Sequence, residues 1–326
     1  MLCLSRREVA SLLTVEECIP ALEAAFARQA EGSDPPPALL GLYTAQGGLH
    51  VKAAVASLDR PYIVAKANAN FPGNRARRGL PTVQGVIAVV DGDDGRFLAL
   101  MDSTEVTVTR TAAATAIAAK HLARRDATAL TVCGCGVQGR AHVRALAHVL
   151  PLRTVRLFDS DRAQADRLAH ELSAVAGLTI EVVDDLTAAV RASDACVTCT
   201  PSRAPLLGGD ALTPGLFVAG VGADSHDKHE LAPEVLAASR LVVDHLEQCA
   251  TIGDLHHALA AGAVSLDAVH ATLPELVTGR RPGRTTDAEV TVFDSTGVAT
   301  EDAAAALLVY RRAVEAGLGV SLDLGA

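Results

Sequence analysis

Three glycines in the middle of the chain have the spacing of a turn that could bind a ligand. Gly134, Gly136 and Gly139 follow a short apolar run, 129–133, and precede an alanine-rich segment, 140–150. A strand that passes through Gly-x-Gly-x-x-Gly into a helix is typical of dinucleotide binding, because the glycines permit a tight turn, a close approach to a pyrophosphate and close helix–strand packing. The pyrophosphate then lies on the N–H groups that open the helix. The spacing predicts a nucleotide site, and a glycine turn without a ligand is the alternative.

An acidic residue downstream bears on which nucleotide binds. Residues 154–158 are expected to form the next strand, and Asp159 ends it at about the spacing at which a carboxylate holds the adenosine ribose hydroxyls. A carboxylate there repels the additional phosphate of NADP, so NAD is expected. Arg162 lies close enough in the sequence to accept that phosphate, which leaves NADP open. Val137 and Gln138, which open the helix after the glycine turn, complete this part of the predicted cofactor site.

A lysine and an arginine outside this segment could act on a substrate. Lys66 lies in an otherwise apolar, strand-like run, where burial would lower the pKa of its ammonium and suit it to proton transfer. A lysine at a strand edge in solvent is the alternative. Arg110 stands near the start of a helix of mostly small residues and can present a fork of N–H groups to a carboxylate. Taken alone, Arg110 is better explained as a helix-surface arginine.

Two polar loops are expected at the carboxyl ends of strands, where the ligands of parallel α/β sheets bind. One loop holds Thr200, Pro201 and Ser202, and the other begins at Val221 and runs to Glu230. The second loop is rich in residue types that bind metals, but its spacings match no standard zinc pattern. We therefore predict no metal site.

The predicted secondary structure that positions these residues differs between the two halves of the chain. Residues 9–31 have helical spacing, and residues 39–90 hold short extended runs that predict an antiparallel sheet, with a hairpin turn at 91–95. Residues 109–124 predict a long alanine-rich helix, and 301–317 predict another. After the long helix, strands alternate with helices, which predicts an α/β fold with a parallel, doubly wound sheet of Rossmann type. The predicted strands of that sheet are 130–133, 155–158, 180–183, 195–199, 217–221 and 241–243.

Composition limits the class of protein. The chain has 326 residues, of which 49% are hydrophobic and 3% aromatic, so Ala, Val and Leu must fill a core large enough for two domains. The net charge of −9 argues against a nucleic-acid partner. No apolar run approaches the roughly 20 residues of a membrane span, and the first residues lack the order of a signal peptide. We therefore expect a cytoplasmic protein with no nucleic-acid or membrane partner.

These features together resemble the ornithine cyclodeaminase/μ-crystallin family over nearly the full length of the chain. The resemblance is greatest to the archaeal-type alanine dehydrogenases of that family, which share the runs 244–248 and 293–297. The matching segments, in order, are Lys66 to Asn74, Gly79 to Gly85, Arg110 to Ala113, Gly134 to Gly139, Thr200 to Ser202, Gly220 to Asp224, Lys228 to Leu231 and Phe293 to Gly297.

The resemblance implies domains, an assembly and site residues. It implies an NAD-binding domain over 121–297, and a discontinuous α+β domain over 1–120 and 298–326 for substrate binding and dimerisation. The partner is expected to be a second copy, in a homodimer whose substrate domains pair through their sheets. Lys66 and Asp224 are implied as the acid–base residues, and Arg110 as the group that holds the substrate α-carboxylate. The cofactor contacts are expected from Gly134, Gly136, Val137, Gln138, Gly139, Asp159, Thr82 at the nicotinamide end, Thr200, Pro201, Ser202, Val221 and Lys228.

Three positions depart from the family pattern. Ala38 stands where many members carry a basic residue, and His50 stands where the ornithine cyclodeaminases carry a glutamate that receives the distal ammonium of the substrate. Lys52 falls where members usually have methionine, and it is two residues from His50, so both can face the same side of a strand. A cation at Lys52 could replace the missing carboxylate partner. We therefore include Lys52 and His50 among the expected substrate-binding residues and leave the substrate side chain open.

Three functions are compatible with these observations. The first is an NAD(H)-dependent amino-acid dehydrogenase or ketimine reductase, which acts on the C–N bond of a small α-amino or α-imino acid. The second is a cyclodeaminase, in which bound NAD is used twice and a side-chain amine closes a ring with loss of ammonia. The third is a nucleotide-gated binding protein of μ-crystallin type. Net consumption of NADH separates the first from the second, and the absence of any turnover would indicate the third.

Overall fold

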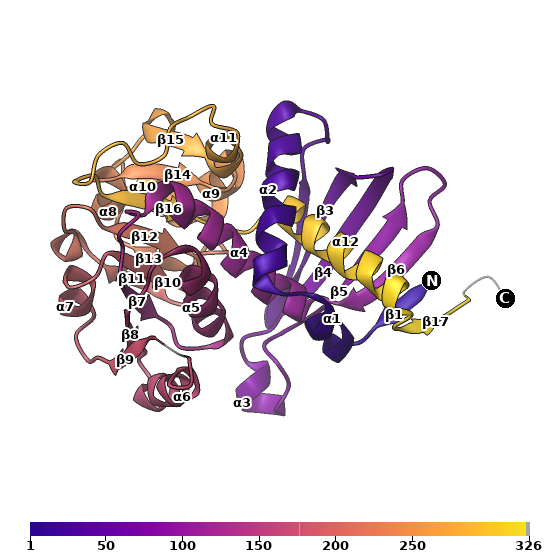
Figure 1. Cartoon of the computed structure of the whole chain (residues 1–326), viewed down its shortest axis with the longest axis horizontal. Coiled ribbons are helices and arrows are strands. Elements are labelled where there is room, and N and C mark those ends of the chain that lie inside the picture. Colours follow the sequence, from indigo (N-terminus) through magenta and orange to yellow (C-terminus); the bar gives the residue numbers. More distant parts are fainter. Residues whose placement is uncertain (176, 324–326) are drawn as a thin grey trace. The chain divides into compact units, whose positions relative to one another are not determined.

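The computed structural model describes residues 1–175 and 177–323, and the chain divides into two compact units (Figure 1). Unit 1 consists of Met1–Arg110 and the segment that begins at Val298, and unit 2 is Thr111–Gly297. Both this division and the domain boundary expected near residue 120 fall within one helix, α4 (Thr104–Leu122).

The sheet of unit 1 is largely antiparallel, as its short extended runs predicted. Strands β2 to β6 pair antiparallel in sequence order, β1 joins β6 in parallel, and β17 pairs with β1. Alternate residues of a strand lie on opposite faces, so on β4 Tyr62, Val64 and Lys66 are buried while Ile63 is 41% exposed. The order is β17 (Val320–Ser321), β1 (Leu2–Leu4), β6 (Phe97–Asp102), β5 (Val83–Asp91), β4 (Pro61–Asn70), β3 (Gly47–Ser57) and β2 (Ala38–Thr44).

Two long helices of unit 1 come from opposite ends of the sequence. The helix α12 (Ala299–Ala316) packs against α2 (Val15–Glu31) and lies along β3 and β4, as the yellow and indigo helices of Figure 1 show. The helical spacing of residues 9–31 is interrupted, because Leu13 is extended and separates α2 from α1 (Arg6–Leu12). Gly32, with a φ of +72°, ends α2 in the left-handed conformation that glycine favours. A short helix, α3 (Asn74–Arg78), precedes β5.

The main sheet of unit 2 is parallel throughout, which confirms the predicted doubly wound fold. The chain passes from β7 to β8 and β9 on one side and then returns to β10 on the other side of β7. Loops after β7 and β10 therefore leave the sheet at the point where the strand order reverses, which is where ligands of such folds bind. The order is β15 (Val269–Thr272), β14 (Arg240–Val243), β16 (Thr291–Asp294), β12 (Phe217–Gly220), β10 (Ala195–Thr198), β7 (Ala129–Cys133), β8 (Thr154–Phe158) and β9 (Thr179–Val182).

Smaller elements complete unit 2. A two-stranded parallel ladder joins β11 (Arg203–Leu207) and β13 (His229–Leu231). The helices are most of α4, then α5 (Val137–Val149), α6 (Arg162–Leu172), α7 (Leu186–Arg191), α8 (Pro233–Ala237), α9 (Leu246–Ile252), α10 (Asp254–Ala260) and α11 (Leu273–Val277), with short 3-10 turns at Gly209–Ala211 and Leu266–Ala268. In the described part of the chain, the helices are all too short or too polar to cross a membrane.

Two of the differences between the structure and the sequence predictions concern α4 and β16. The helix α4 begins at Thr104 and not at residue 109, and Asp102 accepts the N–H of this first helical residue at 2.9 Å, which satisfies a donor that has no partner within the helix. Arg110 therefore lies in the second turn of the helix rather than near its start. The strand β16 was not predicted, yet it lies inside the sheet between β12 and β14.

Candidate functional site

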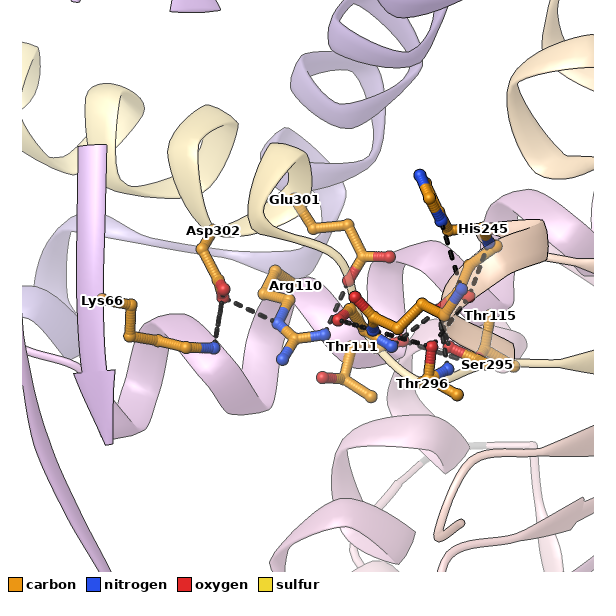
Figure 2. Close-up of polar contacts among 12 residues, drawn as sticks. Lys66, Arg110, Thr111, Thr115, His245, Ser295, Thr296, Glu301 and Asp302 are labelled. Carbon is orange, nitrogen blue, oxygen red and sulfur yellow. Dashed lines mark hydrogen bonds and ion pairs between the residues drawn. The ribbon is translucent and has the colours of Figure 1, made fainter. Parts of the chain in front are cut away.

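Lys66 belongs to a buried cluster of charged residues in unit 1 (Figure 2). Its side chain leaves β4 on the face that packs against α12, and the residue is 3% exposed. The Nζ atom lies 2.7 Å from the Asp302 carboxylate of α12. A lysine at a strand edge in solvent, the alternative left open by the sequence, is therefore wrong.

Arg110 reaches the same cluster from α4 (Figure 2). Its Nη1 donates to Glu301 Oε2 at 2.6 Å, and its Nε lies 3.0 Å from Asp302 Oδ1. The residue is 5% exposed, so the helix-surface arginine that its local sequence favoured is also wrong. Glu301 and Asp302 stand at the start of α12, where the partial positive charge of a helix N-terminus stabilises carboxylates. Two cations and two carboxylates are thus held together away from solvent.

Burial and neighbouring charges set the pKa values in this cluster. Burial lowers the pKa of Lys66 to about 7, with Arg110 and Lys52 adding to this effect and Asp302 opposing it. Burial alone would raise the pKa of Asp302, but Arg110, Lys66 and Lys52 hold it below its ordinary value. Lys66 can therefore exchange a proton near neutral pH beside a carboxylate that stays ionised, which suits it to acid–base work.

Lys52 and His50 lie on β3, the strand next to β4. Lys52 pairs directly with Lys66 across the antiparallel ladder, and its charge acts on the pKa of both Lys66 and Asp302. His50 stands two residues earlier on the same strand, and its Nε2 lies 2.9 Å from the Tyr43 hydroxyl. The structure therefore brings Lys52 to the charged cluster, whereas the His50 imidazole contacts Tyr43 on the neighbouring edge strand, β2.

The glycine turn of unit 2 has the geometry of a nucleotide cradle. Gly134 has a φ of +105°, and a Cβ built on it would lie 2.9 Å from a backbone oxygen of the loop after β10. A Cβ on Gly139 would lie 2.1 Å from the Gly134 carbonyl oxygen. Gly136 is the N-cap of α5, and a Cβ there would meet no described atom within 4 Å. Close packing therefore requires the first and third glycines, and the second leaves space where the N–H groups of Val137 and Gln138 can receive a phosphate.

Asp159 ends β8 beside this turn. Its Oδ2 accepts the Cys135 N–H at 2.8 Å, so the carboxylate is held at the edge of the glycine turn. Arg162, in the first turn of α6, pairs with Asp166 at 3.2 Å and with Asp184 at 2.5 Å. The guanidinium that could accept the extra phosphate of NADP therefore contacts two carboxylates.

We expect NAD(H) to bind more tightly than NADP(H) by about 10-fold or more, because Asp159 places a like charge beside the additional phosphate. Fluorescence titration of NADH and NADPH measures the ratio. Asp159→Ala should reduce the preference, and Arg162→Ala, the matched control, should leave it unchanged. Tighter binding of NADPH by the unmodified protein would show that Arg162 leaves its carboxylates to receive the phosphate.

One buried carboxylate connects the two polar loops of unit 2. Glu230 accepts the Thr200 N–H and hydroxyl at 2.6 and 2.7 Å, the Gly222 N–H at 2.6 Å and the Thr198 hydroxyl at 2.9 Å. Burial raises the pKa of Glu230, and these hydrogen bonds oppose the rise. Glu230 therefore fixes the loop of Thr200 to Ser202, which follows β10, against the loop that begins at Val221 after β12.

The remaining predicted residues occupy the loops of their own units. In the loop after β12, Lys228 Nζ donates to Asp224 Oδ1 at 2.5 Å, and the Asp224 side chain is 49% exposed. Thr82 belongs to unit 1, between α3 and β5, and its carbonyl oxygen accepts the Phe71 N–H at 2.8 Å. Among residues 1–175 and 177–323, no group of three or more His, Cys, Asp or Glu side chains is arranged to hold a metal ion.

Comparison with known proteins identifies the family of this chain. The model of the ornithine cyclodeaminase/mu-crystallin family matches residues 1–317. The chain belongs to this family. An alanine dehydrogenase from Archaeoglobus fulgidus is 35% identical over 318 residues, which cover 98% of this chain and 97% of that protein. An archaeal alanine dehydrogenase dimer with bound NAD has a TM-score of 0.95 at 34% identity, over 99% of both chains.

Two further members of the family differ in their named reactions. The structure of Thermococcus litoralis Δ1-pyrroline-2-carboxylate reductase, in complex with NADH and L-proline, has a TM-score of 0.92 at 32% identity, over 99% of this chain and 100% of that one. The iminosuccinate reductase of Paracoccus denitrificans is 33% identical over 337 residues, which cover 99% of this chain and 100% of that protein. The chain is thus similar to an alanine dehydrogenase, a pyrroline-2-carboxylate reductase and an iminosuccinate reductase, and solved structures of the first two contain bound NAD or NADH.

Sequence reasoning missed three residues of the candidate site: Glu230, Glu301 and Asp302. Glu301 and Asp302 open a predicted alanine-rich helix, where adjacent acids are ordinary N-terminal residues. The signal that could have found them is the number of alanines around them, since a helix with so few polar residues is buried on most sides. The sequence predicts a loop at Glu230, and the apolar residues that follow it, 231–232, are the signal for a buried position.

Proposed function

We propose that this chain is an NAD(H)-dependent oxidoreductase that acts on the C–N bond of a small α-amino or α-imino acid. The observation that carries the proposal is the buried pairing of Lys66 with Asp302 beside Arg110. This cluster contains a proton donor that titrates near neutral pH and a fixed guanidinium suited to a carboxylate. The glycine turn and Asp159 fit a dinucleotide, and the reactions named for the similar proteins support the same class.

The residues divide the work of such a reaction between them. NAD(H), when bound, supplies or accepts the hydride. In the reductive direction, Arg110 binds the α-carboxylate and so orients the C=N bond, while the Lys66 ammonium donates the proton that the substrate nitrogen gains. In the oxidative direction the neutral Lys66 amine takes that proton back. We propose Asp224 as the second proton-transfer group, which acts on the water or ammonia that enters or leaves.

The cofactor roles follow from the loops of unit 2. We propose that Gly134, Gly136, Val137, Gln138 and Gly139 hold the pyrophosphate and Asp159 the adenosine ribose. The Thr200–Ser202 loop, the loop from Val221 to Lys228, and Thr82 of unit 1 complete the cofactor contacts in this proposal.

A screen of NADH oxidation tests the proposed reaction. It covers α-keto acids with ammonia or amines, together with cyclic imines, and a parallel assay follows ammonia release from ornithine, lysine and diaminobutyrate. Net NADH consumption with an imino acid is the expected result. Ammonia release without net NADH consumption would indicate a cyclodeaminase, and the absence of turnover with NADH binding intact would indicate a binding protein.

We expect ornithine to be a poor substrate and a neutral or acidic side chain to be preferred. Lys52 adds a cation opposite Lys66, and His50 replaces the acid that a distal ammonium would need. Lys52→Met should raise KM for the carboxylate substrate, and His50→Glu should improve the tolerance of a diamino acid. Steady-state kinetics with alanine-like, acidic and diamino substrates measures these effects. Efficient formation of proline from ornithine by the unmodified enzyme would refute this expectation.

We propose a homodimer that forms through the open face of the unit 1 sheet. The face away from α12 carries small apolar residues in register, with Ala65 opposite Ala88 and Ala67 opposite Val86. Ile63 and Val86 are 41% and 43% exposed there, and such an apolar face is typical of an interface between copies. The archaeal alanine dehydrogenase of the same family is a dimer.

Val86→Asp is expected to convert the dimer to a monomer, because it buries a charge in the apolar interface. Analytical ultracentrifugation gives the mass of the assembly in solution. Val314→Asp is the matched control, since Val314 is 58% exposed on α12 and lies outside this face. A dimer that persists in the Val86→Asp protein would place the interface elsewhere.

A further inference from the structure

We propose that Asp302 is a positioning residue that holds the Lys66 ammonium and the Arg110 guanidinium in one arrangement, so that the proton donor and the carboxylate-binding group act as a unit. This inference rests on the reaction proposed above. It assigns a function to a residue that lies outside the sequence motifs and the predicted cofactor loops.

The geometry gives Asp302 a role that its neighbour does not share. Asp302 contacts both cations, with Lys66 Nζ at 2.7 Å and Arg110 Nε at 3.0 Å, whereas the ion pair of Glu301 at 2.6 Å is with Arg110. Figure 2 shows the Asp302 carboxylate between the two cationic side chains. A carboxylate that bridges two donors restricts the orientation of both, because each charge-assisted hydrogen bond is short and directional.

The charges around Lys66 make this carboxylate necessary. Three elements place a charged group against it: Lys52 on β3, Arg110 on α4 and Asp302 on α12. Two of these are cations, which together with burial favour the neutral amine. Asp302 is the charge that opposes them, so it increases the protonated share of Lys66 at neutral pH while also keeping Lys66 near Arg110.

The presence of a lysine, and not an arginine, at position 66 is consistent with this control of its protonation by Asp302. The chain has four lysines against 25 arginines, so most positive charges are supplied by the residue that does not lose its proton. Lys66 and Lys52, two of the four, stand opposite each other at the cluster. A lysine can change its protonation state under the control of a neighbouring carboxylate, and an arginine cannot.

The test measures the protonation of Lys66 directly and then its effect on turnover. In protein labelled with 13C-lysine, only four side chains contribute signals, and Lys66→Met identifies the one of interest. The midpoint of Lys66 should lie near pH 7 in the unmodified protein. Asp302→Asn should lower it by about 1 to 3 pH units, the shift that an opposite charge in contact produces. Asp302→Glu keeps the negative charge, so its Lys66 midpoint should lie close to that of the unmodified protein. This variant also provides the test if Asp302→Asn folds poorly.

Glu301→Gln is the matched control, because it removes a carboxylate from Arg110 and leaves Asp302 in place. It should raise KM for the carboxylate substrate without moving the Lys66 midpoint. Asp302→Asn should instead lower kcat for reduction at pH 7 by about 10-fold or more and raise KM as well. An unchanged Lys66 midpoint in Asp302→Asn, or a midpoint near 10 in the unmodified protein, would overturn the inference. A protein inactive with every imino acid would overturn the proposed reaction instead, and the titration would still report on Asp302.

Discussion

Replacing Lys66 by methionine is expected to lower kcat by about 10²- to 10⁴-fold, the contribution typical of a positioned proton-transfer group. Methionine has a similar length but cannot carry a proton, and Lys66 is not expected to hold the nucleotide, so the affinity for NADH should persist. Single-turnover reduction, followed by NADH absorbance, separates the chemical step from binding. Asp224→Asn should show the same pattern, since Asp224 is the second proposed proton-transfer group.

The pH dependence provides an independent check on Lys66. Burial lowers its pKa to about 7, and the donor in imine reduction is the protonated form. The value of kcat/KM for reduction should therefore fall as the pH rises through about 7, whereas oxidation of the amino acid should gain from the same rise. Lys120→Met, which changes an exposed lysine on α4, is the matched control and should leave both profiles unchanged. Retained turnover in Lys66→Met and Asp224→Asn together would show that neither residue carries the proton transfer.

Arg110→Ala is expected to reduce kcat/KM for the amino or imino acid by an amount equivalent to about 2–5 kcal/mol, the cost of removing one partner of a buried charge pair. Arg110→Lys should also be poor, because an ammonium lacks the planar fork that meets a carboxylate and here also meets Glu301 and Asp302. Steady-state kinetics with saturating NADH measures the loss.

The same substitution should destabilise unit 1, because Arg110→Ala removes the cation that pairs with the buried carboxylate of Glu301 and leaves Lys66 as the cation beside Asp302. A thermal melt therefore accompanies the kinetics, and the double variant Arg110→Met with Glu301→Gln tests whether removal of one carboxylate restores stability. If Arg110→Ala folded normally and kept both kcat and KM, the role of Arg110 in binding the carboxylate would be wrong.

Local patterns were sufficient to predict much of unit 2. The turn at Gly134 to Gly139 can be predicted from local sequence, because the contacts that require glycine lie within or next to one strand–turn–helix unit. The strands β7, β8 and β10 are short apolar runs between helices, so their type and the parallel sheet were predictable. The strand β16 was not, since the polar stretch 278–290 precedes it and only its pairing with β12 and β14, distant in sequence, places it inside the sheet.

The charged cluster of unit 1 shows the corresponding limit for a site. Lys66 and Arg110 were candidates by residue type, but local sequence favoured the surface for Arg110. Their burial depends on Glu301 and Asp302, which lie about two hundred residues later in the chain and appear as ordinary helix-opening acids. A pairing at this separation leaves no periodic signal in either segment, so only the folded chain shows which acid meets which base.

Glu230 also limits how this protein can be recombined with its relatives. The carboxylate binds backbone groups of both the Thr200 loop and the Gly222 loop, so neither loop has its shape independently of the other. A chimera that takes one loop from a relative and keeps the other must also carry a compatible acid on β13. The two loops and Glu230 are therefore expected to be exchanged as one unit, and the affinity of hybrid enzymes for the cofactor should depend on that unit as a whole.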